Sequence, residues 1–225
     1  MSLPTPPAQA TVTLDSLTDL LIAGGPFMVP IGLCSVVALA YTFERALRLR
    51  RASLGLSELG GELVEVVRAG GPERGLELCR AKPSPLARVM HTALVTWSAP
   101  MLEREKAVEE SGQREVRRMA AGLRPLVVVV AMAPLLGLLG TVWGMILSFG
   151  AIAQQAGLGR PEMLADGIRQ ALVTTAAGLV VAIPTQAAYF WLKGRIERFV
   201  SAVEDLYVQL GDALRGQVEA GRAHP

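Results

Sequence analysis

The stretch IRQALVTTAAGLVVAIPTQ, residues 168–186, decides the fold of this chain. From Gln170 onward it is part of a run of 23 residues without a charge, which ends at Leu192. A helix rises 1.5 Å per residue, so about 20 apolar residues cross the roughly 30 Å of bilayer hydrocarbon. The length therefore predicts a transmembrane helix over residues 168–192, although the segment carries a glutamine and two adjacent threonines.

Two other stretches are long and apolar enough to span a bilayer. Residues 20–43 are 24 residues without a charge, and the 35 residues between Arg124 and Arg160 are also uncharged, with the apolar part at 125–153. Hydrophobic residues make up 51% of the chain and aromatic residues only 5%. The pattern predicts an all-α membrane protein with three transmembrane helices. The alternative is a soluble bundle with three unusually apolar helices.

The distribution of lysine and arginine predicts the orientation. Residues 1–43 contain none, 44–124 contain fifteen, 193–225 contain five, and the other two are Arg160 in the outer connection and Arg169 at the start of the third span. Positively charged loops stay in the cytoplasm. We therefore expect a short periplasmic N-terminus at 1–19, a cytoplasmic helical region at 44–124, a short outer loop at 154–167 and a cytoplasmic tail at 193–225. The excess of positive charge then reflects topology, and we expect no binding to nucleic acid.

The region between spans one and two has helical periodicity. Residues 54–69 and 73–81 carry apolar residues at helical spacing, and Gly70, Gly71 and Pro72 separate them, which predicts short helices joined by turns. After Pro100 a charged, helix-prone run continues into the second span without a stop signal. We expect one continuous helix there, projecting from the membrane.

Residues that could support enzymatic or metal chemistry are sparse. Cys34 falls in the first span and Cys79 in the cytoplasmic region, so no disulfide is expected between them. His91 and His224 stand alone, without the spacing of metal ligands. No phosphate-binding loop, nucleophile elbow or carboxylate pair is recognisable. The sequence predicts neither an enzyme nor a cofactor.

Small and polar residues recur along the second and third spans. The third span has such residues at four-residue intervals, at Gln170, Thr174, Gly178, Ala182 and Gln186. Small residues let helices approach closely, and polar groups inside a membrane either satisfy each other or line an ion path. Both interpretations stay open. Three spans cannot enclose a path alone, so we expect the extended helices to oligomerise around a central pore. The stripe in the second span consists of Ala133, Gly137, Gly140, Thr141, Gly144, Ser148 and Ala151.

Two motifs carry a resemblance to a known family. APLLGLLGTVWGMILSF (133–149) and GIRQALVTTAAGLVVAIP (167–184), with FER at 43–45, resemble the ExbB/TolQ family of bacterial inner-membrane proton-channel subunits, and more distantly MotA. MotA fits less well, because its likeness implies four spans and a larger cytoplasmic domain. The resemblance implies a homopentamer around a single-span partner similar to ExbD or TolR, whose membrane Asp carries protons, and a TonB/TolA-like protein beyond. The resemblance does not distinguish between TonB-type uptake, Tol-type envelope maintenance and gliding-type motility.

The resemblance also assigns residues. The family's pore threonines match Thr141 and Thr175, and its third-span glutamate falls on Gln170, which cannot release a proton. Either the partner's Asp carries the relay, with threonine hydroxyls and water completing the path, or the ring is a non-conducting scaffold that clusters partners. Gln170 and Thr175 lie about 140° apart around a helix, so both cannot face one axis squarely. Either the pore face is wide, or Thr175 packs against span two while Gln170 or Thr174 meets the partner. The motifs and the small-residue stripe predict packing positions at Ala133, Pro134, Gly137, Gly140, Gly144, Ser148, Gly178 and Pro184.

Overall fold

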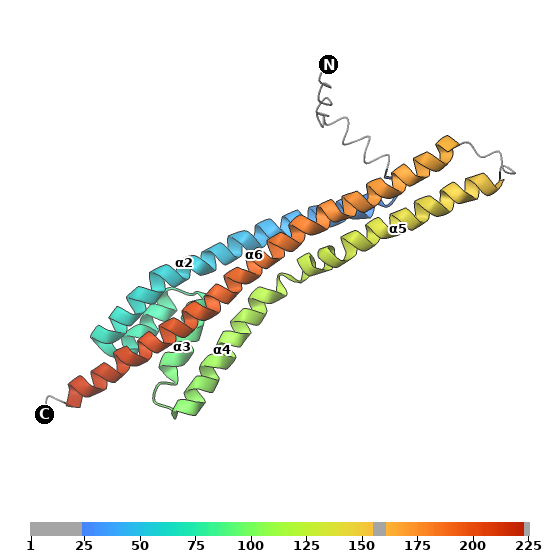
Figure 1. Ribbon diagram of the computed structural model, residues 1–225. Helices are drawn as coiled ribbons and strands as arrows, with labels where there is room; N and C mark the ends of the chain where they lie inside the picture. Colours follow the sequence, from blue (N-terminus) through green and yellow to red (C-terminus); the bar gives the residue numbers. More distant parts are fainter. Residues whose placement is uncertain (1–23, 155–160, 223–225) are drawn as a thin grey trace, which may run out of the picture. The chain divides into compact units, whose positions relative to one another are not determined.

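The computed structural model describes residues 24–154 and 161–222, with side chains for 24–49, 59–150 and 165–216. All regular elements in these residues are α-helices: α2 (Met28–Ala81), α3 (Pro85–Val95), α4 (Met101–Ala121), α5 (Arg124–Gln154) and α6 (Pro161–Arg222) (Figure 1). Three of the helical stretches are long and apolar enough to cross a membrane. The predicted all-α fold with three candidate membrane helices is confirmed. The expected N-terminal segment at 1–19 lies outside the described residues.

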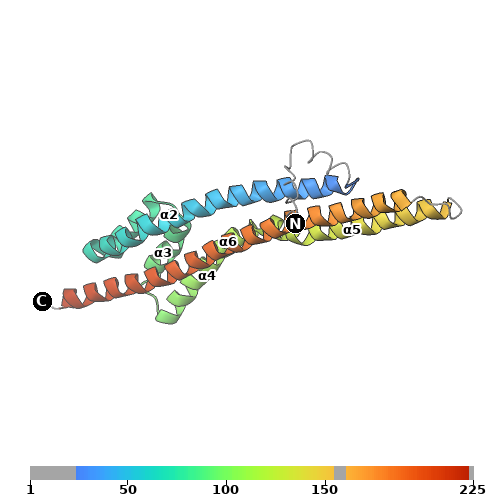
Figure 2. The same cartoon turned by 45° about the horizontal axis from the view of Figure 1, so that its top comes forward.

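The chain divides into two compact units. The membrane unit contains the described residues up to Ala38 together with Val128–Thr185, and the bundle unit contains Leu39–Val127 and the chain from Gln186 onward. Within the membrane unit α5 and α6 run side by side (Figures 1 and 2). The apolar part of the sequence thus forms one unit, and most of the charged part forms the other.

Helix α2 differs in part from the expectation. Gly71 has φ 79° and ψ −177°, so the predicted break before Pro72 is present. The expected separate helix at 54–69 is wrong, because helical structure runs from Met28 to this break without interruption. Gly55 is the one strong helix breaker between residues 44 and 58, and a single glycine costs only about 1 kcal/mol inside a helix. That is too little to end α2.

The expected continuous helix from residue 101 into the second span is also wrong. Helix α4 ends at Ala121, and a turn at Gly122 and Leu123 precedes α5. Pro125 has no N–H to donate to the Ala121 carbonyl, so the α-helical ladder loses a hydrogen bond at this point. Leu123 instead donates to the Ala120 carbonyl at 2.9 Å. A Cβ atom at Gly122 would overlap the Arg45 guanidinium, so the absence of a side chain at this turn lets α2 approach it.

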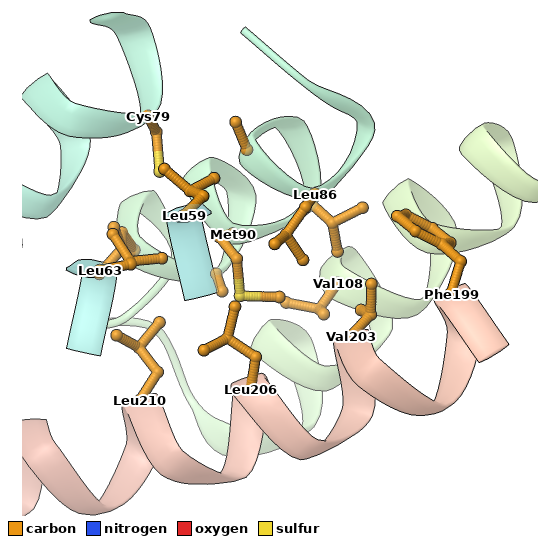
Figure 3. Packing of buried hydrophobic residues seen from close by; sticks show 14 of the residues in the cluster. Leu59, Leu63, Cys79, Leu86, Met90, Val108, Phe199, Val203, Leu206 and Leu210 are labelled. Carbon is orange, nitrogen blue, oxygen red and sulfur yellow. The ribbon is translucent and has the colours of Figure 1, made fainter. Parts of the chain in front are cut away.

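The core of the bundle unit is a cluster of aliphatic side chains. Helix α3 contributes an amphipathic face, and it begins where the Ser84 hydroxyl accepts a hydrogen bond from the Ala87 amide at 3.0 Å, with Pro85 in the first turn. Cys79 is buried at the edge of this cluster, and both cysteines are free. Figure 3 shows the side chains of α2, α3, α4 and α6 meeting in the core. The most buried of them include Leu59, Leu63, Leu86, Met90 and Leu210.

One carboxylate is buried between α3 and α4. Glu115 is 5% exposed, and Arg88 binds both of its oxygens, with Nε at 2.8 Å and Nη2 at 2.6 Å. Arg118 adds a third hydrogen bond at 3.0 Å. The hydrogen bond from Arg88 and the two nearby positive charges hold the pKa of Glu115 below its usual range. This ion pair joins α3 and α4, which also share a hydrogen bond between the Thr92 and Ser111 hydroxyls at 3.3 Å.

We expect Glu115→Gln to destabilise the protein by about 1–3 kcal/mol, because Arg88 loses its charged acceptor. Glu110→Gln is the matched control, since Glu110 is exposed and lies 3.9 Å from Arg114. Thermal unfolding in mild detergent measures both.

The pKa of Glu115 is lowered in the folded state, so its stabilising effect is complete above the unfolded pKa of about 4.3 and is lost as the pH falls through the folded value. The parent should therefore lose its advantage over Glu115→Gln in acid, and an equal loss in both variants at pH 7 contradicts the assignment.

Candidate functional site

The candidate site lies where α5 and α6 touch at backbone level. A Cβ atom at Gly178 would lie 2.5 Å from the carbonyl oxygen of Ala133, and one at Gly137 would lie 3.0 Å from the Thr174 carbonyl oxygen. Farther along, a Cβ at Gly144 would lie 3.1 Å from the Gly167 carbonyl oxygen. The glycine stripe of the second span therefore packs on α6 of the same chain. Larger residues would force the two helices apart.

Thr174 fills the space that a glycine leaves in this contact. Its side chain is fully buried and lies against Gly140, where a Cβ would be 2.6 Å from the Thr174 hydroxyl oxygen. The hydroxyl donates to the Ala171 carbonyl at 2.8 Å. Thr174 is therefore enclosed between α5 and α6, and its side chain has no open face toward a partner.

Thr175 connects the two helices directly. Its hydroxyl donates to the Gly137 carbonyl oxygen of α5 at 3.1 Å, across the helix pair. Thr141 lies one helical turn beyond Gly137, but its hydroxyl donates to the Leu138 carbonyl of its own helix at 2.6 Å. The Thr141 side chain stays partly exposed. Thr175 thus has a packing contact, whereas Thr141 has only a local hydrogen bond.

Gln170 lies on the other flank of α6. Its side chain rests on Gly25, where any Cβ would overlap the amide nitrogen, and Gly25 also has φ 67°, a conformation that favours glycine. Five residues separate Gln170 from Thr175, about 140° around the helix. The four predicted pore residues therefore occupy three environments: Thr141 and Thr175 on one flank, Thr174 in the contact, and Gln170 beside the start of α2.

The remaining predicted packing positions vary in burial. Ala133 and Ser148 are buried, and the Ser148 hydroxyl donates to the Gly144 carbonyl at 2.8 Å. Pro134 is partly buried, and Pro184 is exposed.

Sequence reasoning missed Gly25, although the Gly24-Gly25-Pro26 run is a strong turn signal. It also missed Gly167, which follows the same four-residue interval as Ala171 on the contact face.

The chemistry available at this site is limited to hydrogen bonding. Hydroxyl and amide groups can hold water or bind a carboxylate, but they do not ionise near neutral pH. Within the described residues, no group of three or more His, Cys, Asp or Glu side chains could hold a metal ion. Such a site can line a polar path through a membrane, while any titrating group must come from elsewhere.

Comparison with known proteins identifies a family of membrane proteins that resembles this chain. Residues 81–205 match the MotA/TolQ/ExbB proton channel family. An ExbB homolog of Methanothermobacter thermautotrophicus is 28% identical over 84% of this chain and 67% of that protein. Biopolymer transport protein exbB1 of Vibrio cholerae is 30% identical over 85% of each chain. Tol-Pal system protein TolQ of Pseudomonas aeruginosa is 31% identical over 80% of this chain and 84% of that protein.

The fold and the site define a three-span helical membrane protein with a close-packed, polar pair of helices. The chain belongs to the MotA/TolQ/ExbB proton channel family, and the likeness to ExbB and TolQ proteins covers most of its length. It is a multi-pass inner-membrane protein of a family of proton channels, which is not a class of enzymes.

We expect Gly178→Ala to destabilise the helix pair by about 1–3 kcal/mol, because the new methyl group overlaps the Ala133 carbonyl. Gly194→Ala is the matched control on the same helix, since a Cβ there meets no atom within 4 Å. This control should stabilise the protein by up to about 1 kcal/mol. Thermal unfolding in detergent compares the variants. Equal melting temperatures for the two variants contradict the close contact.

Proposed function

We propose that this chain is the ring-forming subunit of a motor driven by the proton-motive force. Five copies surround the membrane helix of a single-span partner similar to ExbD or TolR, and the partner's membrane Asp carries the protons. Movement of the partner then transmits energy to the cell envelope. Support comes from the match to the proton channel family and from the resemblance of both spans to ExbB and TolQ.

The partly exposed hydroxyl of Thr141 carries this proposal. It lies within the 35-residue uncharged stretch of the second span. The neighbouring Leu138 and Val142 side chains are 57% and 47% exposed, so α6 leaves this face of α5 uncovered. A hydroxyl there can form a hydrogen bond with water or with a partner's carboxylate without loss of packing within the subunit. Thr175, on the same flank, holds α6 against α5 through its hydrogen bond to the Gly137 carbonyl.

Gln170 has a different role in this proposal. An amide cannot titrate, so the subunit contributes no carboxylate at this position and depends on the partner's Asp. The contact with Gly25 places Gln170 beside the start of α2. From there its amide holds water at the edge of the path and fixes the turn that precedes the first span.

The proposed orientation has the N-terminus in the periplasm and the bundle unit in the cytoplasm. Cys79 is a poor reporter of it, because burial raises the pKa of its thiol from about 9 to about 11. Thiolate is the reactive form, and this shift lowers the thiolate fraction at neutral pH roughly 100-fold. Exposed alanines on either side of the membrane offer better positions, and Ala81 and Ala165 are both exposed.

In a Cys34→Ala background, Ala81→Cys should react with a membrane-impermeant maleimide only in inverted vesicles. Ala165→Cys should react only in intact spheroplasts, because it precedes the third span on the opposite side. The parent with Cys79 alone should react slowly in both until it is unfolded. The reverse labelling pattern overturns the orientation.

Thr141→Val should nearly abolish function driven by the proton-motive force and leave assembly intact, because valine keeps the shape but has no hydroxyl. Gln170→Leu should lose activity by excluding water. Gln170→Glu should keep substantial activity with a shifted pH dependence, because a largely protonated carboxyl still donates and accepts hydrogen bonds. The measurements are energised function in cells and complex yield with the partner. Wild-type function in both Thr141→Val and Gln170→Leu would replace the proton path with a non-conducting scaffold.

A further inference from the structure

A groove of about 570 Å³ runs between α4 and α6 in the bundle unit. Its floor is apolar, because Val108, Phe199 and Val203 are at most 8% exposed and belong to one cluster where α4 meets α6 (Figure 3). Ligand pockets hold about 300–1,000 Å³. This α4–α6 groove is therefore large enough to receive several side chains of a bound segment.

The border of the α4–α6 groove is acidic. Glu105, Glu109 and Glu204 line it and are exposed, and no lysine or arginine is among the described residues that line it. None of the three carboxylates forms an ion pair with a residue that the structure describes. Glu109 accepts one hydrogen bond, from the neutral Gln113 amide at 3.0 Å. The groove therefore combines an apolar floor with three negative charges that no described cation neutralises.

Arg104 lies next to one end of the groove but already has partners. Its Nε donates to the Tyr207 hydroxyl at 3.1 Å, and its guanidinium stacks on the Trp97 ring at 4.1 Å. Tyr207 itself lines the groove and is partly buried. Aromatic faces and carboxylates both attract cations. The groove thus suits a segment that carries apolar side chains together with lysine or arginine.

The proposed function supplies a segment with this chemistry. A single-span partner that acts on the envelope has its mass in the periplasm, so only a short end of it stays in the cytoplasm. Short cytoplasmic ends of membrane proteins are rich in lysine and arginine. The first 43 residues of this chain contain neither, so its own N-terminus cannot provide the cations.

The groove lies within reach of a short segment. Arg124 is the last charge before 35 uncharged residues, and Lys193 is the first charge after 23 uncharged residues, so both mark the membrane boundary. Phe199 and Tyr207 follow Lys193 by 6 and 14 residues, which is about 9 and 21 Å along α6. An extended chain covers about 3.3 Å per residue, so about seven residues from the boundary span this distance.

We propose that the α4–α6 groove binds the short cytoplasmic segment of the single-span partner. Apolar side chains of the segment pack on Val108 and Val203, and its lysines or arginines lie beside Glu105, Glu109 and Glu204. Charge complementarity of this kind selects the partner and fixes its orientation. The inference rests on the proposed function for the identity of the partner. Through the groove the ring holds the partner's cytoplasmic end outside the membrane, at a distance from the Asp that carries protons.

The first test uses a peptide in place of the partner. The probe is a short fluorescent peptide of lysine and serine with leucine at two positions one helical turn apart, added to the purified full-length chain in maltoside detergent. The same peptide with glutamate in place of lysine measures non-specific contact with protein and detergent. Fluorescence anisotropy should show binding of the lysine peptide only, and this binding should weaken as the ionic strength rises. Equal binding of the two peptides overturns the proposal.

Gly112 allows a test of charge at a single position. It lines the groove, and a Cβ atom there meets no atom within 4 Å, so the fold tolerates a side chain. Gly112→Lys should weaken binding of the lysine peptide roughly tenfold, whereas Gly112→Glu adds a side chain of similar size and should not weaken it. Gly194→Lys is the control, because it adds the same charge to α6 outside the groove and its Cβ also meets no atom. Equal losses in the two Gly112 variants, or in Gly112→Lys and Gly194→Lys, contradict the groove.

The second test uses the complex with the single-span partner. Neutralising the lysines and arginines that precede the partner's span should lower the yield of complex with the parent chain, and Gly112→Lys should remove this dependence. If the complex forms but its yield depends neither on these residues nor on Gly112, the inference fails and the proposed function stands. If no such partner copurifies, the proposed function fails, and the peptide result alone decides what the groove binds. If the Gly112 variants instead lower the oligomer mass of the chain, the groove is a contact between copies and the inference fails.

Discussion

The close approach of α5 and α6 is the contact on which the membrane unit depends. In hydrocarbon there is no hydrophobic force between helices, so van der Waals contact and hydrogen bonds must hold them together. Glycines at 137, 140 and 178 bring the two backbones together, and the Thr175 hydroxyl then reaches the Gly137 carbonyl. Because this contact fixes how α6 is turned, it also decides that Thr174 is enclosed, that Thr141 stays partly exposed and that Gln170 meets Gly25.

The bundle unit depends on different forces. Its core is aliphatic and excludes water, and its buried carboxylate is stable because Arg88 and Arg118 satisfy both oxygens. The change between the two environments occurs within single helices, since α2, α5 and α6 each belong to both units. Arg124 and Lys193 mark this change on α5 and α6. Cations at such positions hold helix ends at the headgroup level, where the charge remains hydrated.

The replacement of a carboxylate by Gln170 shapes the functional interpretation. A ring built only from hydroxyls and amides provides hydrogen bonds but no proton acceptor. In the proposed motor the titrating group therefore moves with the partner, and the ring supplies a fixed polar surface. Proton transfer and motion then both occur in the partner, so the two are directly coupled.

The sequence by itself determined the three spans, because the thickness of hydrocarbon sets how many uncharged residues a helix needs. It also determined the break at Gly71 and the membership of the family, since both depend on local residues and motifs. The tertiary structure decided the rest. Helical spacing predicts which residues share a face but not what that face meets, so the burial of Glu115, the contact of Gln170 with Gly25 and the packing of the glycine stripe within one chain were not predictable. The end of α4 has a local cause in Pro125, whereas the approach of Arg45 to Gly122 from another helix was not predictable. Contacts between residues far apart in sequence leave no periodic signal along the chain.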